Sequence, residues 1–170
     1  MFLELIATFV AALGAAGLVM GLNMMTGGRL PKWLMPVAAG AAMIAYAVWS
    51  EYSWAGRTVA GLPEGVVEVS RVDERIAYKP WTYIVPQTTR LMAADAGGAA
   101  TRPDAPALRL VNLYLFARWQ PARTVPILVD CETAARADAT EAALADPAQA
   151  DWLPLPAGDP LVVAVCTSRE

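Results

Sequence analysis

Two long apolar runs open the chain, and mixed apolar and polar residues fill the rest of it. Residues 2–25, FLELIATFVAALGAAGLVMGLNMM, carry one charged side chain, near the start of the run. Residues 33–52 form a second apolar run with tryptophan and tyrosine at its ends, as is typical of the two membrane interfaces. A helix of about 20 residues crosses a hydrocarbon layer of about 30 Å. The pattern predicts two transmembrane helices, at about 2–25 and 33–52.

A short connection with two basic residues separates these runs and predicts their orientation. It holds Arg29 and Lys32, and the one other side chain between Phe2 and Trp49 that is charged at neutral pH is Glu4. Short loops that carry Lys and Arg stay on the cytoplasmic side of a membrane. We therefore expect a two-pass protein of the bacterial inner (cytoplasmic) membrane, with both termini and the C-terminal domain in the periplasm. A cleaved secretory signal is not expected, because the N-terminus has no basic segment.

Small residues recur in both predicted helices. They are Gly14, Gly17 and Gly21 in the first helix and Ala38, Ala41, Ala42 and Ala45 in the second. Small side chains let helix backbones approach closely in lipid, where no hydrophobic force drives helices together. Two interpretations stay open. Either these faces pack against each other in the hairpin, or one of them binds a helix of a larger membrane complex.

The composition changes after the second run and predicts a separate C-terminal domain. We expect residues 1–54 to form the membrane anchor, residues 55–64 a tether, and residues 65–170 a periplasmic β-rich domain. Most of the charged residues lie in this last part, which is long enough to bury one modest core. The sequence thus predicts a membrane-anchored α+β fold. A two-helix transmembrane hairpin precedes a small, mainly antiparallel β domain with room for one short helix.

Alternating patterns place most of the strands. Residues 65–75 are rich in valine and residues 81–95 in aromatic and β-branched side chains, and both predict strands, with Pro86 at a bulge or a sheet edge. The clearest signal is ALRLVNLYLFARWQPARTVPILVDC, residues 107–131. Its apolar residues alternate on either side of a turn at about residues 120–123, which predicts a hairpin.

The remaining segments are less regular. Residues 94–107, ADAGGAATRPDAPA, read as a mobile surface loop. The Ala-rich, acidic residues 132–151 predict either a short helix before Pro147 or a strand extension followed by an ordered loop. Residues 151–160 are expected to be irregular because they contain three prolines, and residues 161–170, LVVAVCTSRE, read as a last strand.

Two cysteines, Cys131 and Cys166, lie in this domain. In an oxidising compartment the simplest interpretation is one disulfide. By the chain-entropy model, closing a loop of about 35 residues stabilises a domain by roughly 3–4 kcal/mol. Two free thiols and a redox pair are the alternatives, although redox pairs usually have C-x-x-C spacing. The disulfide and the periplasmic location support each other.

Few residues of this chain suit catalysis. There is no histidine, so the usual general base and the commonest metal ligand are missing. Two cysteines alone cannot build a four-ligand zinc site, and the common nucleotide-binding glycine motifs do not occur. The acidic neighbours Asp73 with Glu74 and Asp130 with Glu132 are candidate carboxylate pairs, but adjacent acids in strands usually mark a solvated edge. We expect no enzyme activity, no cofactor and no metal.

Two surface features suggest binding. Tyr78, Lys79, Trp81 and Tyr83 lie together in the sequence YKPWTY. Such residues either anchor a partner, touch the membrane surface or pack into the core.

Three arginines, Arg109, Arg118 and Arg123, lie on or beside the predicted hairpin and are expected to face Asp130. Cross-strand ion pairs explain them, whereas an anion site requires them to converge. A nucleic-acid partner is not expected, because the net charge is −3.

The leading hypothesis is a non-enzymatic inner-membrane accessory or assembly subunit of a larger membrane protein complex, which presents a periplasmic β domain. The alternative is a membrane-tethered periplasmic binding module for a ligand or an envelope component. The expected partners are membrane lipid and other integral membrane proteins, and a homo-oligomer is compatible with the sequence.

Overall fold

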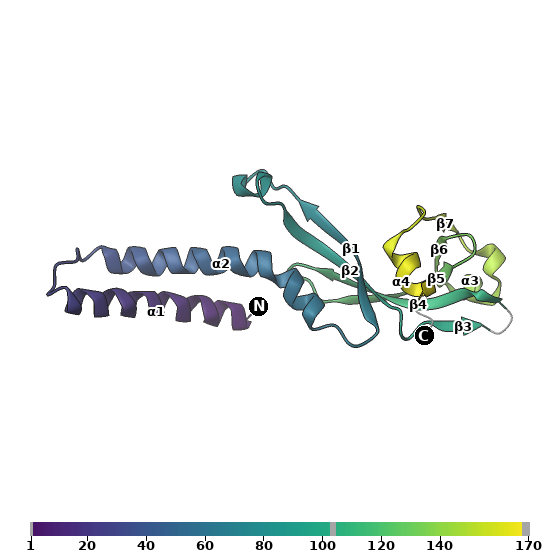
Figure 1. Ribbon diagram of the computed structural model, residues 1–170, viewed down its shortest axis with the longest axis horizontal. Helices are drawn as coiled ribbons and strands as arrows, with labels where there is room; N and C mark the ends of the chain where they lie inside the picture. The colour runs from purple at the N-terminus through teal and green to yellow at the C-terminus, as the bar shows by residue number, and fades with distance from the viewer. Residues whose placement is uncertain (1, 103–104, 168–170) are drawn as a thin grey trace. The chain divides into compact units, whose positions relative to one another are not determined.

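The computed structural model describes residues 2–102 and 105–167 (Figure 1). The chain divides between Trp54 and Ala55 into two compact units. We call residues 2–54 the helical hairpin and residues 55–167 the β domain.

The helical hairpin contains helix α1 (Phe2–Met25) and the larger part of helix α2 (Leu34–Ala60). Each helix is long and apolar enough to cross a membrane, which confirms the two apolar helices predicted from the sequence. α2 continues past the expected end at residue 52, because residues 51–60 contain no proline. It ends where the N–H of Gly61 donates to the carbonyls of Arg57 and Thr58. The first part of the expected tether is therefore helical.

An ordered turn connects the two helices. Gly28 has a φ of +77°, which glycine adopts without strain, and its N–H donates to the carbonyl of Asn23 at 2.8 Å. The side-chain Oδ1 of Asn23 accepts the N–H of Leu30 at 3.0 Å. Arg29 and Lys32 are exposed in this connection.

The β domain is an antiparallel half-barrel with short helices. Its strands are β1 (Val66–Glu74), β2 (Gln87–Asp95), β3 (Ala100–Arg102), β4 (Ala105–Ala117), β5 (Arg123–Asp130), β6 (Ala135–Asp138) and β7 (Leu153–Pro154). The short helices are η1 (Pro80–Tyr83), α3 (Glu141–Ala145), η2 (Pro147–Gln149) and α4 (Pro160–Thr167). The strand order is β1-β2-β4-β5-β6-β7, and β3 pairs with β4.

The hairpin predicted from the alternating pattern is β4 with β5. Val111 lies opposite Ile127, and Leu113 lies opposite Val125. These apolar residues share one face of the sheet, as expected from period-2 alternation. The connecting residues 118–122 come slightly earlier than expected.

The expectation of a mobile loop at residues 94–107 is wrong for most of its length. β2 continues to Asp95 and pairs with the second half of β4. β3 follows and pairs with the first half of β4. Between β2 and β3, the N–H of Gly97 donates to the carbonyl of Gly65 at 3.0 Å. A segment made of alanine and glycine shows little alternation of apolar and polar residues, so its pattern does not predict a strand. The same small residues allow two backbones to approach this closely. Residues 103–104 lie outside the described residues.

Two further strand predictions need correction. Residues 81–95 do not form one strand, because η1 occupies the first part and β2 begins only after Pro86. Pro80 and Pro86 cannot donate a backbone N–H to a sheet ladder, which separates the segment from the sheet.

Residues 161–167 form helix α4 instead of a strand, and residues 168–170 lie outside the described part of the chain. Pro160 fixes a helical φ in the first turn, and Oδ1 of Asp159 accepts the N–H of Leu161 at 2.9 Å. Leu161 and Val165, one helical turn apart, are both buried. This burial explains why a run rich in β-branched residues is helical here.

The Ala-rich segment combines both expected outcomes. It extends the sheet as β6 and then forms the helices α3 and η2. The hydroxyl of Thr140 caps α3 by accepting the N–H of Ala143 at 3.2 Å. The expected irregular stretch after it contains the two-residue strand β7, which pairs with β6.

The main core lies between the sheet and α4. Its buried residues are Val69, Ala94, Val111, Leu113, Ile127, Val129, Leu161 and Val165. The alternate residues of the same strands, including Leu91, Ala93 and Leu128, are buried as well. The sheet is therefore apolar on both faces in its centre.

Candidate functional site

The glycines of α1 do not pack against α2. Within the described residues, a Cβ added at Gly14, Gly17 or Gly21 would have nothing within 4 Å beyond its own chain neighbours and the adjacent helix backbone. Gly14 and Gly17 are exposed. Gly21 is half-buried, and a side chain at any of the three positions would have open space around its Cβ, so a glycine face of α1 stays open.

The four alanines of α2 lie along one face of the helix, because their spacing is i, i+3, i+4 and i+7. Ala38 and Ala42 are half-buried, whereas Ala41 and Ala45 are exposed. The face that carries these alanines is therefore only partly enclosed.

Glu4 links the two helices of the hairpin. Its carboxylate Oε1 accepts a hydrogen bond from the hydroxyl of Ser50 at 3.0 Å. Ser50 is buried and Glu4 is half-buried. The acidic group therefore has a polar partner inside the hairpin.

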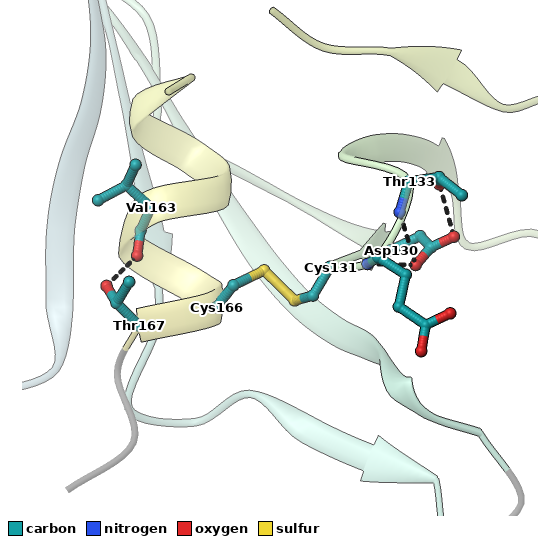
Figure 2. Close-up of a disulfide and its surroundings, with 7 residues drawn as sticks. Asp130, Cys131, Thr133, Val163, Cys166 and Thr167 are labelled. Carbon is teal, nitrogen blue, oxygen red and sulfur yellow. Dashed lines mark hydrogen bonds between the residues drawn. A yellow bond between two sulfur atoms is a disulfide. The ribbon is translucent and has the colours of Figure 1, made fainter. Parts of the chain in front are cut away.

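A disulfide joins Cys131 to Cys166, with Cα atoms 5.8 Å apart (Figure 2). Cys131 directly follows β5, and its N–H donates to the carbonyl of Ala107 at 3.0 Å. Cys166 lies in the last turn of α4, whereas the sequence placed it at the end of a strand. The bond fastens α4 to the end of the β4–β5 hairpin, so of the three interpretations of the cysteines the structure shows the bridged one.

The candidate carboxylates make local hydrogen bonds. Asp130 accepts the N–H of Glu132 at 2.9 Å and the hydroxyl of Thr133 at 2.6 Å (Figure 2). Asp73 accepts the hydroxyl of Thr88 at 2.6 Å across the β1–β2 pair. Both acids thus stabilise a turn or a strand pair. Within residues 2–102 and 105–167, no three Asp, Glu or Cys side chains gather as a metal site would require.

The three arginines on or beside the β4–β5 hairpin do not converge. Arg109 pairs with Val129 in the β4–β5 ladder, whereas Asp130 pairs with Leu108, so the Arg109 and Asp130 side chains leave opposite faces of the sheet. Arg109 is 8% exposed, and its Nε has no hydrogen-bond partner in the described part of the chain.

The other two arginines lie near the turn of that hairpin. The Arg118 guanidinium stacks over the ring of Trp119, 4.1 Å from its centroid. Arg123 begins β5, opposite Leu115. The expected set of ion pairs to Asp130 is therefore not what the structure shows.

The aromatic patch of the sequence lies in the connection between β1 and β2. Tyr78, Trp81 and Tyr83 are all exposed, so core packing does not account for them. Lys79 donates to the side-chain oxygen of Gln87 at 3.1 Å, and its ammonium lies 5.8 Å from the Tyr78 ring centroid. The sequence analysis missed the next two residues, Ile84 and Val85, which are exposed as well.

Two adjoining cavities along the sheet are lined entirely by residues that the structure describes. The first has a volume of about 530 Å³, and its residues are Met92, Leu113, Leu115, Val125, Ile127, Arg136, Ala137, Asp138, Thr140, Gln149, Ala150, Asp151 and Leu153. The second has about 460 Å³, and its residues are Val72, Arg90, Leu91, Met92, Leu115, Phe116, Ala117, Gln120, Pro121 and Arg123. Met92 and Leu115 line both, so the cavities adjoin.

The charges of the two cavities differ. Asp138 and Asp151 line the first, together with Arg136, whereas the second holds Arg90 and Arg123. Both cavities lie in the size range of small-molecule sites. Sequence reasoning missed Arg90, because its position beside β4 depends on how β2 pairs with that strand.

No protein-family model, no curated protein and no solved structure matches this chain.

Proposed function

We propose that this chain is a non-enzymatic accessory or assembly subunit of a larger membrane protein complex. In this proposal the helical hairpin anchors it in the bacterial inner membrane and the β domain lies in the periplasm. The length and apolar character of both helices support the anchor, and the disulfide supports an oxidising compartment. The basic connection between the helices supports a cytoplasmic loop.

The open glycine face of α1 carries the proposal of a helical partner. Gly17 and Gly21 form a G-x-x-x-G pair, which lets a second helix approach closely in lipid. Within the described hairpin nothing of α2 fills this face. A transmembrane helix of another protein would gain van der Waals contacts there.

The test is purification of the tagged full-length protein from its native membrane in a mild detergent, with mass spectrometry of the proteins bound to it. We expect a stoichiometric partner that has its own transmembrane helices. Gly17→Leu and Gly21→Leu should release that partner. Gly56→Leu is the matched control, because Gly56 is also a helical glycine in open space but lies beyond the apolar run. Recovery of the protein alone or as a homodimer contradicts the proposal.

The proposed orientation has its own test. An impermeant maleimide applied to intact spheroplasts should label Asp146→Cys in the β domain and leave Thr26→Cys in the connection unlabelled. Both positions are exposed, so accessibility within the protein does not decide the result. Labelling of Thr26→Cys without Asp146→Cys would place the β domain in the cytoplasm.

The second candidate function is a membrane-tethered binding module, and the two adjoining cavities favour it. Their linings combine apolar side chains, such as Met92 and Leu115, with charged side chains, which suits a small amphiphilic molecule. Native mass spectrometry of the purified protein should then show a bound small molecule. Met92→Trp, which places a larger side chain at a position that lines both cavities, should remove it. Leu144→Trp, at an exposed position that lines neither cavity, should not.

A further inference from the structure

We propose that the loop between β1 and β2 inserts into the surface of the lipid bilayer. We call residues 75–86 the tip loop. The proposal assigns it a lipid surface as its partner, separate from the helical partner proposed for α1.

The tip loop exposes large apolar side chains along most of its second half. Five large side chains are exposed on it, which are Tyr78, Trp81, Tyr83, Ile84 and Val85. Ile84 is 85% exposed and Tyr78 is 78% exposed. Contiguous exposed apolar side chains mark interaction sites.

The backbone beneath these side chains is ordered by one buried threonine. Thr82 is completely buried, and its hydroxyl accepts the N–H of Ile76 at 2.8 Å and donates to the carbonyl of Lys79 at 2.7 Å. The N–H of Thr82 also donates to the Lys79 carbonyl, at 2.9 Å. The loop is therefore a built turn that holds its apolar side chains outward, and little ordering is needed when they bind.

The residue types of the tip loop match those of a membrane interface. Tryptophan and tyrosine are enriched at the level of the lipid headgroups, and aliphatic side chains lie just below them. Arg75 and Lys79 are the charged residues of the loop, which has no Asp or Glu. This positive charge complements anionic headgroups. A bilayer accepts such a loop without a shaped pocket, which favours lipid over a protein partner.

The chain is long enough for the loop to return to the bilayer that holds the apolar helices. Beyond Tyr52, at the end of the apolar run, α2 rises by about 12 Å to Ala60. Residues 61–65 add at most about 18 Å. The nine residues of β1 span about 30 Å, as much as this spacer.

The test uses the full-length protein, with Ile84→Cys labelled by an environment-sensitive maleimide fluorophore. Cys131 and Cys166 are joined to each other and do not react without a reductant. The protein is reconstituted in vesicles of phosphatidylethanolamine and phosphatidylglycerol that contain doxyl-labelled lipids. Asp146→Cys, exposed in the same domain, is the control position.

We expect blue-shifted emission at position 84 and a loss of about half of the fluorescence to the doxyl lipids, with little loss at position 146. Adding Trp81→Ala should reduce the quenching, and so should replacing phosphatidylglycerol with phosphatidylcholine. Emission typical of water at position 84 would overturn the proposal. Blue-shifted emission without quenching would also overturn it, because the loop would then be covered by protein.

Discussion

The helical hairpin and the β domain are both rich in apolar residues, but they place them differently. No residue of α1 is buried, and Leu13 is 72% exposed. In the β domain, by contrast, Leu91 and Val129 are completely buried. α1 is apolar on all sides and not buried, whereas the central strands are apolar on both faces and buried. A helix that is apolar all round needs lipid or another protein around it, but these strands are already covered inside the domain.

This comparison predicts where a substitution matters. Stability of the β domain depends on contacts inside the chain, so changes there should lower its free energy of unfolding. Under the proposed function the helical hairpin depends on contacts outside the chain, so changes there should affect association first. Two predictions test this difference directly, and two more compare positions inside the β domain.

The largest effect is expected from removing the disulfide. The double variant Cys131→Ser/Cys166→Ser should destabilise the β domain by about 4 kcal/mol, because the unfolded domain is no longer constrained by the closed loop. The helical hairpin should be unaffected. Hydrogen exchange with mass spectrometry along a urea series measures both parts in one sample. Equal loss of protection in α1 would mean that the two units unfold together.

A matched pair of leucine truncations should give the next largest effect. Leu91→Ala should cost the β domain about 3 kcal/mol through the cavity it leaves, whereas Leu13→Ala in detergent should cost less than about 0.5 kcal/mol. Urea unfolding of both full-length variants measures the difference. Similar costs for the two would show that Leu13 packs on something inside the chain.

The sequence predicts those elements that have a local and repeated signal. The two apolar runs predict α1 and α2, since a helix in lipid requires little besides length and apolar character. The β4–β5 hairpin is predictable because Val111 and Leu113 alternate in step with Val125 and Ile127 across a short turn. In each case the residues that form the pattern also make the contacts.

Contacts between distant residues decide the elements that the sequence misplaces. α4 contains valines typical of a strand, but it is helical because Leu161 and Val165 pack on the sheet. β3 is short and contains alanine, so its hydrophobicity does not identify it as a strand. Its pairing with β4 does. The open face at Gly17 could not be predicted either, because the same small residues suit packing inside the hairpin and packing against a partner.

A smaller effect is expected where β1 begins, close to the turn between β2 and β3. Gly65 has a φ of +86°, and its added Cβ would lie 3.0 Å from the Cα of Gly97. Gly65→Ala should cost about 2 kcal/mol, from backbone strain together with this contact. Gly158→Ala is the control, because Gly158 has a φ of +80° with nothing within 4 Å. It should cost about 1 kcal/mol, from strain alone. Thermal unfolding of both variants separates the two contributions, and equal costs would exclude the close contact as a cause.

The smallest effect is expected at the surface of β1, where the guanidinium of Arg71 donates to both carboxylate oxygens of Glu68, at 2.8 and 2.9 Å. These hydrogen bonds raise the pKa of Arg71. A basic group with a raised pKa stabilises the fold when the pH lies below the pKa that the group has in the unfolded chain. This stabilisation is lost only as the pH rises through the pKa of the folded state, so the contribution of Arg71 is constant at neutral pH. Because both side chains are partly exposed, Glu68→Gln should cost at most about 0.5 kcal/mol, and high salt should remove the difference. Urea unfolding at low and high salt measures it. A larger cost that persists in salt would mean that Glu68 stabilises the backbone bulge between Glu68 and Ser70, and the edge of the sheet would then depend on internal contacts as its centre does.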